Sequence, residues 1–356
     1  MKIPNLNFLS KIQPLKAKNA FKGYGCALLF KGDEFGFNSD NFDKSVLVKR
    51  GIIPSDKDLG EFFDEISTKI FKDENSKTLA SLLKGRYITL STSCYNDLKN
   101  PYSATAVKLD PKRAESVNCA KLENEIKSGK GVGINFSEFN DPINQIKKIN
   151  EYFKYRENSL NRPPAGIGLL NINHPKILDF ITLKDNADYK DWCFDLSVII
   201  PNDFFDKVDK NEDIILTDGT KIPSKTIYSA LLSSMAKKGE PGVIFSDDKN
   251  YICDSCATAK LSENEGLTLA HINLSRFYNN GKIDYDYLST SADIISKAMK
   301  NIDPNGYIGI LGYQDLLNKM NLNYGEDEAN KVLDKCLKTI KTEVSKNSIK
   351  MALSPT

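Results

Sequence analysis

Cys256 is the side chain whose surroundings most favour chemistry. It lies in the polar stretch 247–265, which shows no hydrophobic periodicity. The apolar runs 243–245 and 267–274 stand on either side of this stretch and predict buried strands. A loop between two strands can present one sulfur inside a cage of strands. The alternative interpretation is that Cys256 is a small apolar residue, buried for its packing alone.

The other residue types limit the chemistry that is available. Histidine occurs only at positions 174 and 271, so a histidine-rich metal site or an imidazole-based triad is not expected. We expect His271, inside an apolar run, to be a core histidine with satisfied hydrogen bonds. Cys253 and Cys256 have the spacing of half a zinc site, but the sequence has no second pair of this kind. We therefore predict no metal site.

Composition excludes several classes of protein. The net charge of +2 gives no basic excess for nucleic-acid binding. No run approaches the roughly 18 apolar residues needed to span a bilayer, and the first residues do not resemble a secretory signal. The cysteines are odd in number (7) and scattered, which favours free thiols in a reducing compartment. We predict a cytoplasmic globular protein with neither membrane nor nucleic-acid partners.

The hydrophobic pattern divides the chain near residue 85. Residues 1–85 are predicted to be mostly helical, for example over 59–71, where apolar side chains recur at helical spacing. Residues 86–356 alternate strands with helices, which predicts parallel βα units in an α/β barrel or doubly wound sheet. The predicted strands include 87–94, 134–136, 165–171, 194–200, 308–311 and 349–353, and the predicted helices include 141–155, 175–183, 285–302 and 326–345.

An ordered set of short motifs extends over roughly three quarters of the chain. The motifs are TLSTSC (89–94), SGKGVGINFSEF (128–139), NRPPAG (161–166) with NHPKILDF (173–180), GEPGVIF (239–245), INLSRF (272–277), IGILGYQDLL (308–317) and ALSPT (352–356). In this order they resemble the large, catalytic subunit of ribonucleotide reductases, of the aerobic and adenosylcobalamin-dependent kinds. The resemblance implies a ten-stranded α/β barrel with a cysteine finger loop, here incomplete and lacking its last strands.

The resemblance also implies roles for particular residues. A thiyl radical on Cys256 would remove the 3′ hydrogen of a ribonucleotide, and Cys94 would be one of two reducing cysteines. A barrel would shield the radical and hold the reacting atoms in near contact. The implied substrate-binding residues are Ser93, Gly131, Gly133, Ser354 and Thr356, and the implied specificity loop contains Asn161, Arg162 and Pro163.

The chain departs from the family pattern around the same cysteine. The segment 254–258 (DSCAT) replaces the family's Asn-x-Cys-x-Glu, so Thr258 stands where a general base is expected. Asp254 is a candidate replacement base. The second reducing cysteine would fall at or next to Leu267–Thr268, where no thiol exists, and Cys253 is a conceivable substitute. We also expect no added N-terminal regulatory domain and a shortened loop after residue 139.

Three functions remain open from the sequence. The first is a reductase catalytic chain, as part of a split enzyme that a second polypeptide completes, or as a homodimer. Its radical would come from adenosylcobalamin or from a metal-containing small subunit. The second is redox-neutral radical chemistry on a nucleotide, and the third is non-catalytic binding of nucleotides or a reductase partner. The catalytic interpretations require the Cys256 sulfur to lie inside the strands, with a cavity between it and the Cys94 sulfur.

Overall fold

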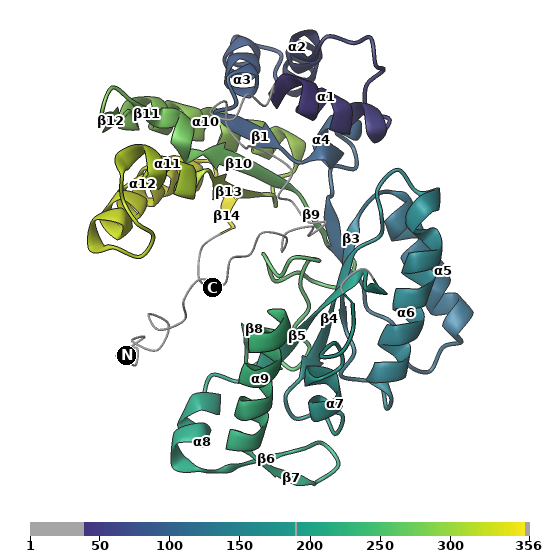
Figure 1. Cartoon of the computed structure of the whole chain (residues 1–356). Helices are drawn as coiled ribbons and strands as arrows, with labels where there is room; N and C mark the ends of the chain where they lie inside the picture. Colours follow the sequence, from purple (N-terminus) through teal and green to yellow (C-terminus); the bar gives the residue numbers. More distant parts are fainter. Residues whose placement is uncertain (1–38, 189–190, 353–356) are drawn as a thin grey trace.

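The structure is a computed structural model that describes residues 39–188 and 191–352 (Figure 1). Helices α1 (Ser39–Lys49), α2 (Leu59–Ile70) and α3 (Asn75–Lys84) come first, and α2 confirms the helix predicted at 59–71. Asp58 caps α2 by accepting a hydrogen bond from the Glu61 backbone N–H at 2.9 Å. The predicted elements before residue 39 lie outside the described residues.

A larger sheet has the strand order β8-β5-β4-β3-β2-β9. Its strands are β2 (Ala104–Ala106), β3 (Gly131–Asn135), β4 (Gly166–Asn171), β5 (Phe194–Ile200), β8 (Gly242–Phe245) and β9 (Gly266–Leu267). Neighbouring strands from β2 to β8 are parallel, and β9 is antiparallel to β2. The prediction of parallel βα units is therefore confirmed.

Helices cover one face of the larger sheet. They are α5 (Glu115–Lys127), α6 (Pro142–Arg156), α7 (Ile177–Ile181) and α9 (Ser224–Lys238), while α8 (Phe204–Lys210) and the hairpin β6 (Asp213–Ile215) and β7 (Lys221–Pro223) lie between β5 and α9 in the chain. Apolar side chains of the four helices pack on alternate strand residues such as Val132, Leu170 and Val198. The opposite face is called the inner face below.

A smaller sheet has the order β1-β10-β13-β14. Its strands are β1 (Ile88–Leu90), β10 (Leu269–Asn273), β13 (Tyr307–Leu311) and β14 (Lys350–Met351). β13 is parallel to β10 and β14, and β1 is antiparallel to β10. Helices α3, α10 (Tyr285–Ile302) and α12 (Asp327–Lys346) bury one face through residues such as Ala270, Ile272 and Ile308. The inner face of this sheet carries the alternate residues.

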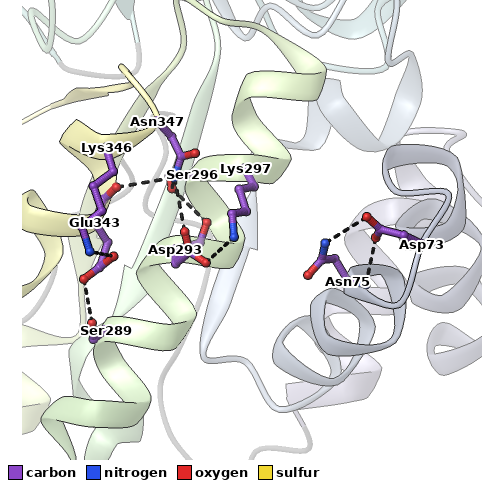
Figure 2. Close-up of polar contacts among 9 residues, drawn as sticks. All are labelled: Asp73, Asn75, Ser289, Asp293, Ser296, Lys297, Glu343, Lys346 and Asn347. Carbon is purple, nitrogen blue, oxygen red and sulfur yellow. Dashed lines mark hydrogen bonds and ion pairs between the residues drawn. The ribbon is translucent and has the colours of Figure 1, made fainter.

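Polar contacts join the two long helices of the smaller sheet. The Ser289 hydroxyl of α10 donates to Glu343 of α12 at 3.0 Å (Figure 2). Just beyond α12, the Asn347 side-chain amide donates to the Ser296 hydroxyl at 2.7 Å. These contacts fix the position of α12 relative to α10, and therefore the point from which the chain enters β14.

The two sheets are joined through β9 and β10. Only Thr268 separates these strands, so one extended segment passes from the larger sheet to the smaller one (Figure 1). Helix α11 (Tyr313–Met320) and the hairpin β11 (Tyr278–Asn279) and β12 (Lys282–Ile283) complete the smaller part. Among the described residues the sheets do not close into a barrel, and ten strands in one barrel are not observed. The fold is mixed α/β with parallel sheets.

The strand predicted at 87–94 is shorter in the structure. It ends at Leu90, and helix α4 (Thr92–Asn96) begins almost at once, so Cys94 lies on a helix. The residues Ser91, Thr92 and Ser93 explain the error, because small hydroxyl residues also favour the start of a helix. In the described ranges no helix is long and apolar enough to cross a membrane.

Candidate active site

The segment 246–265, called the finger loop below, lies against the inner face of the larger sheet. A Cβ atom added at Gly133 would be 1.8 Å from the carbonyl oxygen of Cys253. A Cβ atom at Gly131 would be 2.2 Å from the Ser255 hydroxyl. Only glycine permits this approach, so the glycines of β3 seat the loop on the sheet.

Two asparagines at the carboxyl ends of strands hold the first half of the finger loop. The Asn135 side-chain amide donates to the Tyr251 carbonyl at 2.9 Å, and the Asn171 amide donates to the Lys249 carbonyl at 2.9 Å. Asn135 ends β3 and Asn171 ends β4, two adjacent strands. The sequence analysis missed both residues, although a polar side chain ending a buried strand is a usable signal.

Apolar side chains of the finger loop pack between the two sheets. Ile252, Ala259 and Leu261 share one apolar cluster with Ala104 and Leu267 of the larger sheet and with Leu269 of the smaller sheet. Tyr307 and Ala352 pack against the same cluster. The loop therefore contacts the inner faces of both sheets.

The Asp254 carboxylate organises the turn that carries Cys256. Its Oδ1 accepts hydrogen bonds from the backbone N–H groups of Thr258 (2.7 Å) and Ala259 (2.8 Å). Its Oδ2 accepts from the Cys256 N–H (2.9 Å) and the Thr258 hydroxyl (3.2 Å). Asp254 is 1% exposed. Burial raises the pKa of this carboxyl, and the donated backbone hydrogen bonds partly offset the effect.

Cys256 itself is exposed. The next residue, Ala257, has a φ of +54°, in the left-handed region that non-glycine residues rarely adopt. The expected enclosure of the sulfur by strands is not observed, because the sheets do not form a closed barrel. What the structure provides instead is a thiol on a firmly anchored loop between two inner faces.

Comparison with known protein families decides the relationship. The family model described as "Ribonucleotide reductase, barrel domain" matches residues 118–355. The chain belongs to this family.

Curated relatives agree at low identity. A vitamin B12-dependent ribonucleoside-diphosphate reductase of Thermoplasma acidophilum is 27% identical over 275 residues, which cover 64% of this chain and 36% of the relative. The enzyme of the same name from Mycobacterium tuberculosis strain H37Rv is 23% identical over 225 residues, covering 54% and 32%. The ribonucleoside-diphosphate reductase subunit alpha of Chlamydia pneumoniae is 26% identical over 152 residues, covering 34% and 15%. The chain spans about a third of the length of the first of these relatives.

Two of the cysteines of this reductase-family chain, Cys94 and Cys253, pack in different apolar clusters. Cys94, on α4, is buried with the apolar residues on the helix-covered side of the smaller sheet, and burial raises its pKa to about 11. Cys253 is buried with Ile167, Leu169 and Ile199 on the inner face of the larger sheet. Cys253 therefore belongs to a different cluster from Cys94. The reducing role of Cys94 stays a prediction.

The place expected for the second reducing cysteine is apolar on both strands. Leu267 of β9 lies directly opposite Ala104 of β2, and both side chains belong to the cluster around the finger loop. The neighbouring Thr268 is buried, and its hydroxyl has no hydrogen-bond partner among the described residues. No thiol pair faces the finger loop at this strand pair.

The predicted substrate residues are only partly described. Ser93 donates its hydroxyl hydrogen to the Pro101 carbonyl at 2.7 Å, and Ser354 and Thr356 lie outside the described residues. The finger loop covers the inner side of Gly131 and Gly133. Substrate binding by these residues stays a prediction.

The predicted specificity loop precedes β4. Arg162 donates to the carbonyl oxygens of Ser103 (3.1 Å) and Gly129 (2.6 Å), which tie it to the starts of β2 and β3. Asn161 is exposed and Pro163 is half-buried. A role in specificity stays a prediction. In the described part of the chain no group of three or more His, Cys, Asp or Glu residues could hold a metal ion.

Proposed function

We propose that this chain is a ribonucleotide reductase-like catalytic chain that acts on a ribonucleotide at Cys256. The enclosure of the Cys256 sulfur that the sequence led us to require is not observed among the described residues, so the proposal is carried by the anchored thiol and needs further strands to complete the enclosure. A loop bearing one exposed cysteine is seated on glycines of one sheet and packed against the other, inside the segment that matches the reductase barrel domain. A radical reaction needs its sulfur held in fixed contact with the substrate, and such a loop provides this.

The proposed source of the radical is a separate cofactor or protein. The exposed Cys256 side chain fits an external source, because a generator must approach the sulfur directly. Adenosylcobalamin or a metal-containing small subunit would supply the oxidising radical. This chain's own residues would hold the thiol and position the sugar.

The atoms of the proposed reduction balance only with a dithiol. The Cys256 thiyl takes the 3′ hydrogen, the 2′ hydroxyl leaves as water, and the 3′ hydrogen returns at the end. Two thiols supply two electrons and two protons and become a disulfide. Ala104 and Leu267 cannot supply them, so an external dithiol is the proposed reductant. Asp254 is the proposed base, although its carboxylate already accepts four hydrogen bonds from the loop.

A second candidate is a redox-neutral dehydration at the same site. The apolar pair Ala104 and Leu267 favours it, as does Thr258 in the place of a base. Removal of the 3′ hydrogen, loss of the 2′ hydroxyl as water and return of the hydrogen to C2′ give a 3′-keto-2′-deoxynucleotide. This reaction consumes no thiols.

Product analysis distinguishes the two reactions. Ribonucleoside di- and triphosphates would be incubated with the chain and adenosylcobalamin, or with a radical-generating small subunit, with and without a dithiol. Deoxynucleotide formed with equal consumption of dithiol supports reduction. A ketone or its released base, formed without dithiol, supports dehydration. If every ribonucleotide is recovered unchanged while it binds the chain, both catalytic proposals fail and the non-catalytic binding role is supported.

We propose that strands from another polypeptide pair with the open edges of the two sheets. β8 ends the larger sheet and carries the exposed Phe245, and the exposed Phe205 of α8 lies beside it. The rings of Phe205 and Phe245 lie 6.0 Å apart. An unpaired edge beside exposed apolar side chains is a site for an added strand. We propose that a second polypeptide supplies this strand.

Co-purification tests this partner. The tagged chain would be expressed with the product of a neighbouring reading frame, and the mass of the complex would be measured by light scattering. Phe245→Lys is expected to abolish binding, whereas the exposed Lys331→Ala on α12 should not change it. A mass of twice this chain would support the homodimer instead, and a monomer under all conditions would contradict both.

We also propose a boundary near residue 85 and a cytoplasmic location. Helices α1 to α3 precede the first strand, β1, which starts at Ile88. The odd number of cysteines, scattered along the sequence, supports a reducing compartment. Limited proteolysis and localisation of the tagged chain would test the two proposals.

A further inference from the structure

His271 lies in the middle of β10 and points to the inner face of the smaller sheet. Its neighbours Ala270 and Ile272 are buried on the helix-covered face, and side chains alternate along a strand. Thr89 of β1 and Gly309 of β13 are its cross-strand partners. The imidazole therefore shares the inner face with the residues that contact the finger loop.

The His271 ring packs over Gly309, where a side chain would displace it, and no hydrogen bond to the described residues fixes its orientation. A Cβ atom at Gly309 would be 2.9 Å from Cδ2 and 3.3 Å from Nε2 of His271. The ring is half-buried, and neither nitrogen has a hydrogen-bond partner within residues 39–188 and 191–352. The expectation of a satisfied core histidine is therefore wrong within these ranges. A half-buried imidazole whose nitrogens have no protein partner can donate to and accept from a ligand or water.

The other histidine shows the contrast. His174 Nε2 lies 2.9 Å from the Phe139 carbonyl oxygen, and its Nδ1 accepts a hydrogen bond from the Lys176 N–H at 3.0 Å. Both of its ring nitrogens have partners, so His174 has a structural role. His271 differs because both of its nitrogens are available.

The inner face around His271 combines apolar side chains with one cation on the outer strand β14. Leu269, two residues earlier on the same face, packs with Ala259 and Leu261 of the finger loop. Lys350 of β14 is exposed on the same sheet, with its Nζ 5.2 Å from the centroid of the Tyr307 ring. Burial lowers the pKa of His271 to about 4, so the ring is neutral at pH 7, with one nitrogen as donor and the other as acceptor.

We propose that His271 is a substrate-binding residue whose imidazole N–H donates to a phosphate oxygen of the ribonucleotide on the inner face of the smaller sheet. Lys350 supplies the positive charge. This inference rests on the proposed function, because it takes the ligand to be a ribonucleotide. The imidazole N–H would orient the phosphate through a directional hydrogen bond, and the Lys350 ammonium group would attract its negative charge. Other phosphate sites also combine a cation with neutral donors.

Ligand titration of the unmodified chain tests the inference first. With only two histidines in the sequence, ring ¹H–¹⁵N spectra contain two sets of signals, and a His174→Gln variant assigns them. Adding ADP or CDP is expected to shift the His271 signals and leave those of His174 in place. The matching nucleoside should give a smaller shift, and pyrophosphate alone should reproduce part of the effect. If ADP binds without moving the His271 signals, the inference is overturned.

Variants give the second measurement. Calorimetry is expected to show that His271→Phe and Lys350→Ala each weaken ADP binding about tenfold or more, the scale of one lost charge-assisted hydrogen bond. His271→Gln, which keeps a donor, should retain most of the affinity, and the exposed Lys331→Ala should retain all of it. Wild-type binding that His271→Phe leaves unchanged would overturn this inference alone. Failure of the wild-type chain to bind any ribonucleotide would overturn the proposed function as well.

Discussion

At the scale of single residues, Asp254 shows how a loop without regular structure acquires one shape. Its two carboxylate oxygens accept hydrogen bonds from three backbone N–H groups and one hydroxyl within five residues. The sequence placed Asp254 beside Cys256 but predicted a base. Its structural role depends on the path of the loop backbone, which no periodicity in the sequence encodes.

Removing the Asp254 carboxylate should therefore loosen the loop. Asp254→Ala leaves three backbone N–H groups without their acceptor, one of them on the buried Ala259, and we expect a loss of about 2–4 kcal/mol in the free energy of unfolding. Urea denaturation measures it. Asp248→Ala is the control in the same loop, because it removes an exposed ion pair with Lys260 and one exposed hydrogen bond from the Asn250 N–H, and it should cost about 1 kcal/mol or less. Equal losses in the two variants would contradict the role given to Asp254.

The pH dependence of stability should reveal His271. Its pKa is about 4 when folded against 6.5 for the free side chain, so below pH 6.5 the unfolded chain takes up a proton that the folded chain does not. The contribution of the neutral ring is complete above pH 6.5 and is lost as the pH falls to 4. Compared with His271→Gln, the wild type should lose up to about 3 kcal/mol across this window. Parallel stability curves for the two proteins would contradict the shifted pKa.

At the scale of elements, the glycines of β3 connect a strand to the loop above it. Gly133→Ala would place a methyl group 1.8 Å from the Cys253 carbonyl oxygen, so the finger loop must move. We expect a loss of about 2–3 kcal/mol in stability, together with loss of any activity that depends on Cys256. Gly168→Ala on β4 is the control, since its methyl group would face the Phe136 ring at 3.2 Å on the opposite face. A harmless Gly133→Ala would show that the loop is not seated on β3.

The pairing of β2 with β9 can be tested by introducing thiols. Residues directly opposite in an antiparallel pair have Cβ atoms about 4.5–5.5 Å apart, near the range that a disulfide spans. The double variant Ala104→Cys with Leu267→Cys should therefore form an internal disulfide on mild oxidation, detectable by peptide mass analysis. Ala104→Cys combined with Leu269→Cys, which is not opposite, is the control. Equal yields from the two pairs would contradict the observed register.

The sequence predicted these elements unevenly. Apolar runs and helix caps located β4, β5, α6 and α10 well, because burial and capping are local signals. It extended β1 through Cys94, since serine and threonine suit both a strand end and a helix start. It also could not show that β2 is the neighbour of β9, because pairing between strands far apart in sequence leaves no local pattern. For the same reason, Asn135 and Asn171 were not recognised as contacts of the finger loop, and His271 was not recognised as the substrate contact that we propose.

At the scale of the whole molecule, the finger loop is where the two sheets meet. The cluster of Ile252, Ala259 and Leu261 contacts both of them, and the segment β9–β10 crosses between them beside it. Both of these segments lie within residues 118–355, which match the barrel domain of the family. The motif order predicted that fold class, whereas the open edges of β8 and β14 and the exposure of Cys256 became visible only in three dimensions.

The most direct test is whether conversion of a ribonucleotide depends on the Cys256 sulfur. Wild type, Cys256→Ser and Cys119→Ser, a control at a half-buried thiol on α5, would be incubated with ribonucleotide, radical source and dithiol, and the remaining substrate measured by chromatography. We predict that wild type and Cys119→Ser consume the nucleotide, and that Cys256→Ser binds it but does not convert it. Conversion by Cys256→Ser at the wild-type rate would contradict a catalytic role for Cys256.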